Sequence, residues 1–240
     1  MKVAAMSDVG RLRTNNEDSL LIDEPLGLLI VADGMGGHAG GEVASAMAVA
    51  AIAGYVKGHL AAPQPTGHTA ALLQAAIRTA DEAIWSHSHL HRDLLGLGTT
   101  VILALCEVDQ VHIAHVGDSR AYLLRHGELR QLTEDHSVVA QLIKSGQLTR
   151  RKARSHPLRH QITRSLGSRE AVAELQCISW QRGDYLLLCS DGLTNMVEDR
   201  SIGALILDSA DVLTACEALV ARANANGGHD NISVILAHRD

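Results

Sequence analysis

The sequence predicts an α+β protein in which antiparallel β-sheets are covered by helices. Strand-like runs follow one another through short turns at residues 107–110 and 126–128, as they do in β-hairpins. Apolar residues at helical spacing form separate blocks, so strands and helices are segregated along the chain rather than strictly alternating. Segregation favours an antiparallel sandwich with covering helices over a doubly wound parallel sheet.

The predicted strands are short apolar runs bounded by turn residues. In chain order they cover residues 3–6, 20–22, 28–32, 100–106, 111–116, 121–124, 185–189 and 232–237. Helices are predicted where one face is apolar, over 43–54, 73–84 and 212–220, and the last should end near Gly227. No linker or repeat divides residues 1–240, so we expect a single domain.

Residues 137–168 differ in character from the rest of the chain. They contain one short predicted helix, 138–144, followed by a basic segment with glycine and histidine. We expect this stretch to be an insertion over the core, and we call it the flap. Its basic run, Arg150, Arg151, Lys152 and Arg154, is either a solvated face or a surface that steers anionic segments.

Composition limits the classes of partner and the compartment. The chain has no Phe, two Trp and three Tyr, and its net charge is −6, which argues against nucleic acid as a partner. The four cysteines have no C-x-x-C pairing, so free thiols in a reducing cytoplasm are expected. The longest apolar stretch, 46–56, is too short to span a bilayer, and we expect no membrane association.

Acidic residues recur along the chain in loops that suit metal ligands. Two of these loops follow apolar runs that stop at an Asp-Gly, at Asp33 and at Asp191. A buried strand holds a carboxylate rigidly at its end, and glycine lets the backbone approach a ligand closely. Mg²⁺ and Mn²⁺ bind several carboxylate oxygens together with carbonyls and waters. One Asp-Gly alone is a common turn, but the whole set favours a metal cluster.

The acidic motifs and their order resemble the PPM family of metal-dependent protein phosphatases, the type 2C serine/threonine phosphatases, and their bacterial branch in particular. The resemblance extends over nearly the whole chain, from Ser7-Asp8 to Asp230-Asn231. The motifs that carry it are Arg13 with Asn16-Glu17-Asp18, Val31-Ala-Asp33-Gly-Met-Gly-Gly37, Gly98-Thr99-Thr100, His115-Val-Gly-Asp118-Ser-Arg120, Thr163-Arg-Ser-Leu-Gly167 and Leu188-Cys-Ser-Asp191-Gly192. It implies a four-layer αββα sandwich.

The resemblance also implies a centre with two tightly bound Mn²⁺ or Mg²⁺ ions and a third, weaker one. Asp33 would bridge the first two ions, and the carbonyl of Gly34 would be a further ligand. Asp191 and Asp230 would complete the coordination of the first ion, whereas Glu17 and Asp18 would hold water molecules bound to the second ion. Asp118, with Asp191, would hold the third ion, and Arg13 would bind the substrate phosphate.

The activity implied is hydrolysis of phosphoserine and phosphothreonine by a hydroxide that bridges the two ions. Many eukaryotic members have a histidine after the Asp-Gly, a candidate general acid, where this chain has Met35. A metal-bound water or His38 could serve instead, and His38 is also consistent with a loop histidine that has no chemical role. The simplest interpretation of the alternating histidines His87, His89 and His91 is that they lie in a solvated loop.

Two other functions are compatible with the fold. A non-catalytic phosphoprotein-binding module would have substituted ligands, whereas this chain retains every carboxylate and Arg13. A hydrolase of small phosphate esters would need an enclosed pocket. The expected partners of the phosphatase are phosphorylated proteins and a bacterial serine/threonine kinase, and we expect a cytoplasmic monomer.

Overall fold

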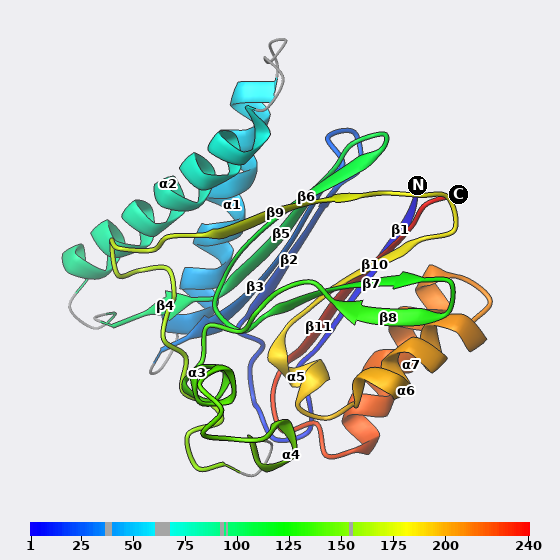
Figure 1. Ribbon diagram of the computed structural model, residues 1–240. Coiled ribbons are helices and arrows are strands. Elements are labelled where there is room, and N and C mark those ends of the chain that lie inside the picture. The colour runs from blue at the N-terminus through cyan, green and yellow to red at the C-terminus, as the bar shows by residue number, and fades with distance from the viewer. Residues whose placement is uncertain (37–39, 61–67, 92–93, 95, 154–155) are drawn as a thin grey trace.

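The computed structural model describes residues 1–36, 40–60, 68–91, 94, 96–153 and 156–240. Its strands form two antiparallel sheets that pack face to face, with helices on the outer side of each (Figure 1). The predicted four-layer αββα sandwich is therefore confirmed.

The strand order in the first sheet is β1 (Lys2–Asp8), β11 (Ile232–His238), β10 (Tyr185–Cys189), β7 (Arg120–Arg125), β8 (Glu128–Gln131). In the second sheet it is β2 (Asp18–Asp23), β3 (Leu28–Met35), β5 (Val101–Cys106), β6 (Gln110–Val116), β9 (Glu174–Ser179), and β4 (Gly98–Thr99) pairs with the end of β3. Each sheet thus joins strands from distant parts of the chain.

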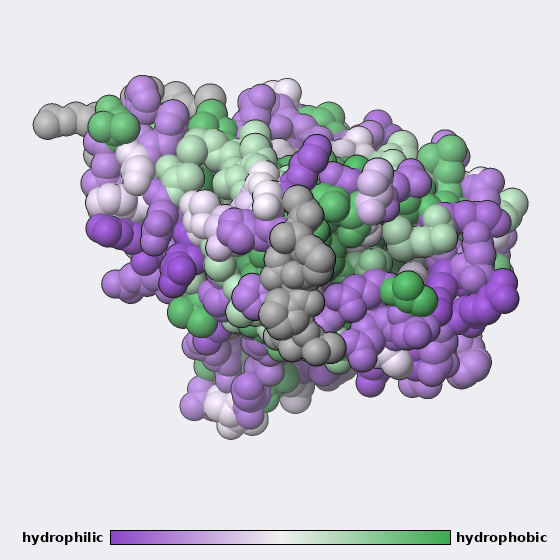
Figure 2. Space-filling view, turned by 90° about the horizontal axis from the view of Figure 1, so that it is seen from above, coloured by the Kyte–Doolittle hydropathy of each residue, from purple (hydrophilic) through white to green (hydrophobic). Residues whose placement is uncertain are grey.

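The helices form the two outer layers and the flap. Helices α1 (Gly40–Leu60) and α2 (Thr69–Leu90) pack on the second sheet. Helices α5 (Asp191–Thr194), α6 (Asp199–Asp208) and α7 (Val212–Ala225) pack on the first sheet. The short helices α3 (Val138–Lys144) and α4 (Arg150–Ala153) lie in the flap, at the end of the sandwich opposite the chain termini (Figure 1). Figure 2 shows the end with the termini, where hydrophilic residues predominate and hydrophobic ones lie among them.

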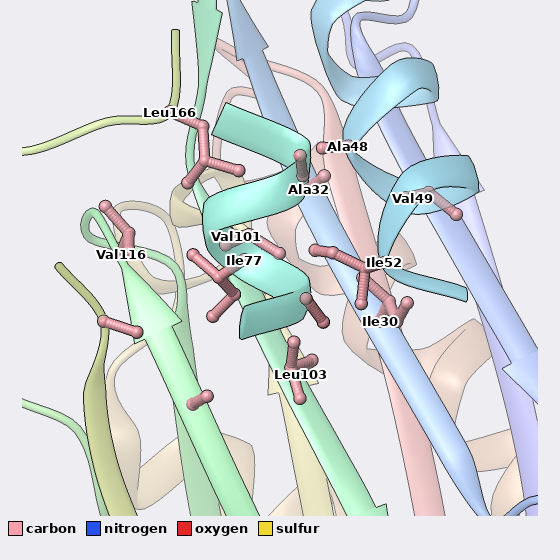
Figure 3. Close-up of a cluster of buried hydrophobic side chains, with 14 of the residues drawn as sticks. Ile30, Ala32, Ala48, Val49, Ile52, Ile77, Val101, Leu103, Val116 and Leu166 are labelled. Carbon is pink, nitrogen blue, oxygen red and sulfur yellow. The ribbon is translucent and has the colours of Figure 1, made fainter. Parts of the chain in front are cut away.

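Three apolar clusters separate the four layers, and β3 contributes to two of them. Leu28, Ile30 and Ala32 face α1 and α2, where they meet side chains such as Ile52 (Figure 3). Leu29 and Val31 point the opposite way, into the cluster between the sheets. Alternate side chains of a strand lie on opposite faces, so a continuous apolar run is what a strand buried on both faces requires. This burial makes the end of β3 a rigid support.

Helix α1 is longer than the apolar run that the sequence suggested. By length and composition alone it could cross a membrane. In the structure, however, Ala44, Ala48, Ile52 and Val56 are buried against the second sheet and α2. These contacts are typical of a core helix.

Every predicted strand and helix is present, but several elements were not predicted. The missed elements include β8, β9 and α6. The sequence of β9 shows why such an element escapes prediction. Its residues alternate between half-buried and exposed, and it lies at a sheet edge, paired only with β6 among the described strands. Edge strands have polar side chains and therefore give a weak apolar pattern.

Candidate metal centre

Asp33 lies near the end of β3, and its backbone is held by the Gly-Thr-Thr motif. Its N–H donates to Thr100 Oγ1 (3.2 Å), and its carbonyl accepts from Thr100 N (2.8 Å) and Thr99 Oγ1 (2.9 Å). The next residue, Gly34, has no room for a side chain, because a Cβ there would collide with the carbonyl oxygens of Gly41 and Glu17. The structure therefore fixes the position of the Asp33 carboxylate through its backbone.

Asp18 and Asp191 lie beside Asp33. Asp18 pairs with Asp33 across β2 and β3, and its Oδ2 accepts a hydrogen bond of 2.9 Å from Ser190 Oγ. Asp191 is the first residue of α5, separated from the end of β10 only by Ser190, and its Oδ2 accepts from Asn195 Nδ2 at 2.8 Å. The other oxygen of each carboxylate, Oδ1, is buried without a hydrogen-bond partner among the described residues. Buried carboxylate oxygens in this state suit a cation.

The remaining acidic residues come from two further turns. Asp118 follows Gly117, whose φ of +111° is rare for other residues. Asp230 precedes Asn231, whose Oδ1 accepts from Glu17 N at 2.8 Å. The Asp-Asn pair thus has divided roles, because Asp230 faces the cleft while Asn231 anchors the loop that carries Glu17.

Burial raises the pKa of four of these carboxyl groups, and repulsion among them adds to the effect. The pKa of Asp18 is raised to about 7, that of Asp118 to about 8 and that of Asp191 to about 6. The pKa of Asp33, which is raised first by burial and then by repulsion from the other four aspartates, lies well above its usual range. A divalent cation would compensate for both the burial and the mutual repulsion of the carboxylates. The donor set therefore fits hard cations bound through oxygen.

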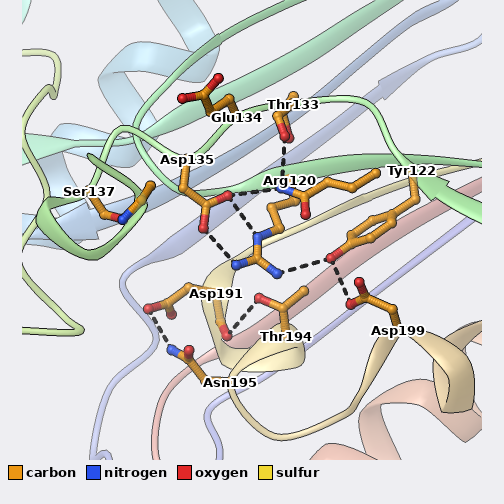
Figure 4. Close-up of polar contacts among 12 residues, drawn as sticks. Arg120, Tyr122, Thr133, Glu134, Asp135, Ser137, Asp191, Thr194, Asn195 and Asp199 are labelled. Atoms are coloured by element: carbon orange, nitrogen blue, oxygen red, sulfur yellow. Dashed lines mark hydrogen bonds and ion pairs between the residues drawn. The ribbon is translucent and has the colours of Figure 1, made fainter. Parts of the chain in front are cut away.

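A fixed cation, Arg120, lies next to this cluster (Figure 4). It binds Asp135 through two hydrogen bonds of 2.8 and 2.6 Å and donates to the hydroxyl of Tyr122 at 3.1 Å. That hydroxyl donates in turn to Asp199 at 3.2 Å. The charge of Arg120 opposes the rise in the pKa of both Asp118 and Asp191. Sequence reasoning missed Asp135, because it lies in an irregular segment after β8.

The structure brings the predicted site residues together in one cleft of about 1170 Å³. The predicted residues that line it are Arg13, Glu17, Asp33, Gly34, Asp118, Asp191 and Asp230, and Met35 is also part of the wall. Asp18 is half-buried beside Asp33 and is not among the lining residues. His38 lies outside the described residues. The cleft continues beneath the flap, where Arg150, Arg159 and His160 line it.

Arg13 contacts the acidic cluster directly. Its guanidinium donates to Asp230 Oδ2 at 2.8 Å, and the two side chains are 47% and 34% exposed. A pair this exposed contributes little to stability. The guanidinium is therefore available to an anion that enters the cleft.

Comparisons with known proteins agree with this geometry. Residues 11–236 match the family model described as protein phosphatase 2C. The chain is 41% identical over 237 residues to the serine/threonine protein phosphatase PstP of Mycobacterium tuberculosis, a match that covers 99% of this chain and 45% of PstP. It is 40% identical over 238 residues to the serine/threonine phosphatase stp of Listeria monocytogenes, covering 98% and 94%. The chain thus spans less than half of PstP and nearly all of stp.

Solved structures show the same fold. A crystal structure of the Mycobacterium tuberculosis phosphatase PstP superposes with a TM-score of 0.92 at 41% identity, covering 100% of this chain and 98% of that chain. A crystal structure of the catalytic domain of PstP in complex with 2 manganese ions has a TM-score of 0.89 at 39% identity, covering 100% and 98%. The chain therefore belongs to the protein phosphatase 2C family.

Proposed function

We propose that this protein is a metal-dependent phosphatase that hydrolyses phosphoserine and phosphothreonine in proteins. The observation that carries the proposal is the convergence of five acidic residues with Arg13 at one end of the sandwich, namely Asp18, Asp33, Asp118, Asp191 and Asp230. Two of their buried oxygens have no hydrogen-bond partner among the described residues. The relatives named as serine/threonine phosphatases support the same conclusion.

The proposed roles follow from where each group lies. Asp33, the Gly34 carbonyl, Asp191 and Asp230 would hold two divalent ions, Mn²⁺ or Mg²⁺. Such ions supply Lewis-acid activation of the phosphate and of the attacking water. Arg13 would bind two phosphate oxygens through its planar guanidinium and so orient the phosphorus.

Other residues would act around these groups. Glu17 and Asp18 would hold waters of the second ion, and Asp118 with Asp191 would hold a third, weaker ion. His38 stays a candidate proton donor for the leaving oxygen, since Met35 has no proton to give. The free cysteines are consistent with a reducing cytoplasm. Phosphoproteins, and the bacterial kinase that phosphorylates them, are the proposed partners, and a monomer is the proposed state.

Phosphate release from a matched set of substrates tests the function. We expect release from phosphoserine and phosphothreonine peptides with Mn²⁺ or Mg²⁺, loss of release with a chelator, and recovery when Mn²⁺ is added back. Peptide binding without release would instead support the binding module. Release from small aryl esters alone would support the small-ester hydrolase.

Replacing Arg13 by Ala is expected to lower kcat/KM for a phosphopeptide by about 10- to 100-fold, because a hydrogen bond to a charged group contributes about 1.5–3 kcal/mol. Mn²⁺ binding, measured by calorimetry, should change little, since the Arg13–Asp230 pair is exposed. Arg13→Lys should recover only part of the loss, because lysine lacks the planar fork. Loss of Mn²⁺ binding in Arg13→Ala would show that the arginine serves the ions.

We expect that replacing the flap cations Arg150, Arg151 and Lys152 by glutamine slows the hydrolysis of phosphoprotein substrates about tenfold at low salt. The reason is that clustered charge raises association rates. A small aryl phosphate, which needs no such steering, should be affected much less. Arg150 lines the cleft, while Arg151 and Lys152 are exposed beside it. The fourth cation of the run, Arg154, lies outside the described residues.

The matched control has the same change of charge on other faces. It replaces three exposed cations in α1, in α2 and before β10 by glutamine, namely Lys57, Arg78 and Arg182. This control variant should leave the rates of hydrolysis of both substrates unchanged. Equal slowing of both substrates by the flap variant would leave only the solvated-face interpretation.

Replacing Asp118 by Ala is expected to remove the weak third ion, leave the two tight ions in place and lower turnover by about tenfold or more. Asp118 lies close enough to Asp191 for their charges to repel, so the two carboxylates could share one cation. Titration calorimetry with Mn²⁺ would count the ions. Parental turnover at every Mn²⁺ concentration would reduce Asp118 to a turn residue.

A further inference from the structure

Both backbone hydrogen-bonding groups of Gly117, its N–H and its carbonyl, are occupied by one residue, His136. The Gly117 N–H donates to His136 Nδ1 at 3.1 Å, and the Gly117 carbonyl accepts from His136 N at 2.9 Å. Gly117 is the residue before Asp118 in the turn between β6 and β7, and its φ of +111° takes it out of strand geometry. His136 therefore holds the backbone just before Asp118, whereas Thr100 holds the residue after it through a hydrogen bond of 2.7 Å to the Ser119 hydroxyl.

The surroundings of His136 hold its ring in one orientation. His115 stacks on it, with centroids 4.6 Å apart and an angle of 14° between the rings. On the outer side, Nε2 lies 3.3 Å from Glu174 Oε2 and 3.3 Å from Arg164 Nη1. Because Nδ1 accepts from Gly117, the proton of the neutral ring lies on Nε2 and is donated to Glu174, so Nε2 accepts no hydrogen bond from Arg164. Burial lowers the pKa of His136, which favours this neutral form.

His115, His136 and Glu174 are close enough to suggest a metal site of their own. The geometry argues against it. A metal binds in the plane of an imidazole ring, and the planes of two nearly parallel rings do not converge on one ion. The Nδ1 lone pair of His136 is also taken by Gly117, so a metal at Nε2 would require a doubly deprotonated ring. The cluster is better explained as a support for the turn.

His136 also joins this turn to the returning end of the flap. Its carbonyl accepts from Thr163 N at 2.7 Å, and the neighbouring Ser137 pairs with Ile162 in an isolated bridge. The peptide unit that carries Asp118 and the segment that closes the flap thus share one residue.

We propose that His136 is a positioning residue that holds the Gly117–Asp118 turn so that Asp118 can bind the third cation. It acts through Gly117 and touches neither substrate nor ion. The inference rests on the role proposed above for Asp118. Its specific requirement is an acceptor at the position of Nδ1.

Two variants of equal shape test this requirement. In His136→Asn the side-chain oxygen takes the place of Nδ1 and can accept from Gly117, whereas His136→Leu has the same shape without an acceptor. We expect His136→Leu to weaken the third Mn²⁺ site by about tenfold in calorimetry, as loss of a residue that orients a ligand does. His136→Asn should restore most of that affinity, and the two tight sites should be unchanged in both variants.

A second readout needs no metal. In the metal-free protein, hydrogen exchange of the Gly117 amide should be about fivefold faster or more in His136→Leu than in His136→Asn, because only the latter retains the acceptor. His136→Gln, whose polar atoms reach the place of Nε2, gives the same comparison if the leucine variant does not fold. His112→Gln, on the same strand as His115 but paired with Glu107, is the control and should change neither readout.

The outcomes separate this inference from the proposals on which it rests. Equal third-site affinity in the parent and His136→Leu, or equal losses in the leucine and asparagine variants, would overturn it. If Asp118→Ala weakens the third site while His136→Leu does not, only the role of His136 fails. If Asp118→Ala leaves three ions bound, the role of Asp118 fails, and the inference about His136 fails with it.

Discussion

Replacing Asp33 by Asn is expected to lower phosphatase activity by on the order of a thousandfold while leaving the fold intact. One carboxylate here is proposed to serve both tight ions, whose combined stabilisation of the transition state amounts to several kcal/mol. The fold should persist because Thr99 and Thr100 bind the backbone of Asp33 and not its side chain. Asparagine also removes a buried negative charge from a cluster of like charges. The measurement is phosphate release from a phosphothreonine peptide with saturating Mn²⁺, beside a thermal melt.

The control for this experiment is Asp109→Asn, which makes the same chemical change at an aspartate whose side chain is 81% exposed and paired with Arg239. It should retain full activity. Near-parental turnover in Asp33→Asn with Mn²⁺ supplied would contradict the two-metal assignment itself, since no other predicted ligand is shared by both ions.

The ends of the buried strands were the part of the site that sequence alone could locate. An apolar run such as that of β3 or β10 has to be buried, and the aspartate that ends the run lies at the metal-binding end of the sandwich. The sequence predicts that the first of these strands stops at Asp33-Gly34, but β3 continues to Met35, because Gly34 and Met35 pair with β4. The side of the sandwich to which each acidic loop points was not predictable from spacing alone. It depends on pairings between distant residues, such as Asp18 with Asp33, which only the folded sheets establish.

The residues that support the ligands were largely missed for the same reason. Asp135 and His136 lie in an irregular segment, and their partners, Arg120 and Gly117, precede them by more than one strand. Neither has a local pattern that indicates a role. The Gly-Thr-Thr motif at Thr99 and Thr100 was recognised only through the family resemblance, and the structure adds its physical reason, which is to hold the backbone of Asp33.

The metal-free protein is expected to lose stability as the pH rises from 6.5 to 8.5, with a thermal midpoint that falls by several degrees. Burial raises the pKa of Asp18 to about 7 and that of Asp118 to about 8, from an ordinary value of 3.8. In this window the unfolded chain has already released these protons, whereas the folded chain gives them up only as the pH rises. The folded state therefore binds more protons, and the free energy of unfolding decreases with increasing pH.

The histidines affect only the lower part of this window. Burial lowers the pKa of His136 and His160 from an ordinary 6.5, so their contribution runs in the opposite direction and ends once the unfolded chain has lost these protons, by about pH 7.5. Saturating Mn²⁺ should remove most of the loss, because a cation replaces the protons and binds the ionised carboxylates. Asp118→Asn should flatten the decline in the metal-free protein, since it removes one of the groups that titrate there. A metal-free protein more stable at pH 8.5 than at pH 6.5 would mean that these carboxyl groups are already ionised, and the burial and mutual repulsion that define the centre would then be too weak to demand a cation.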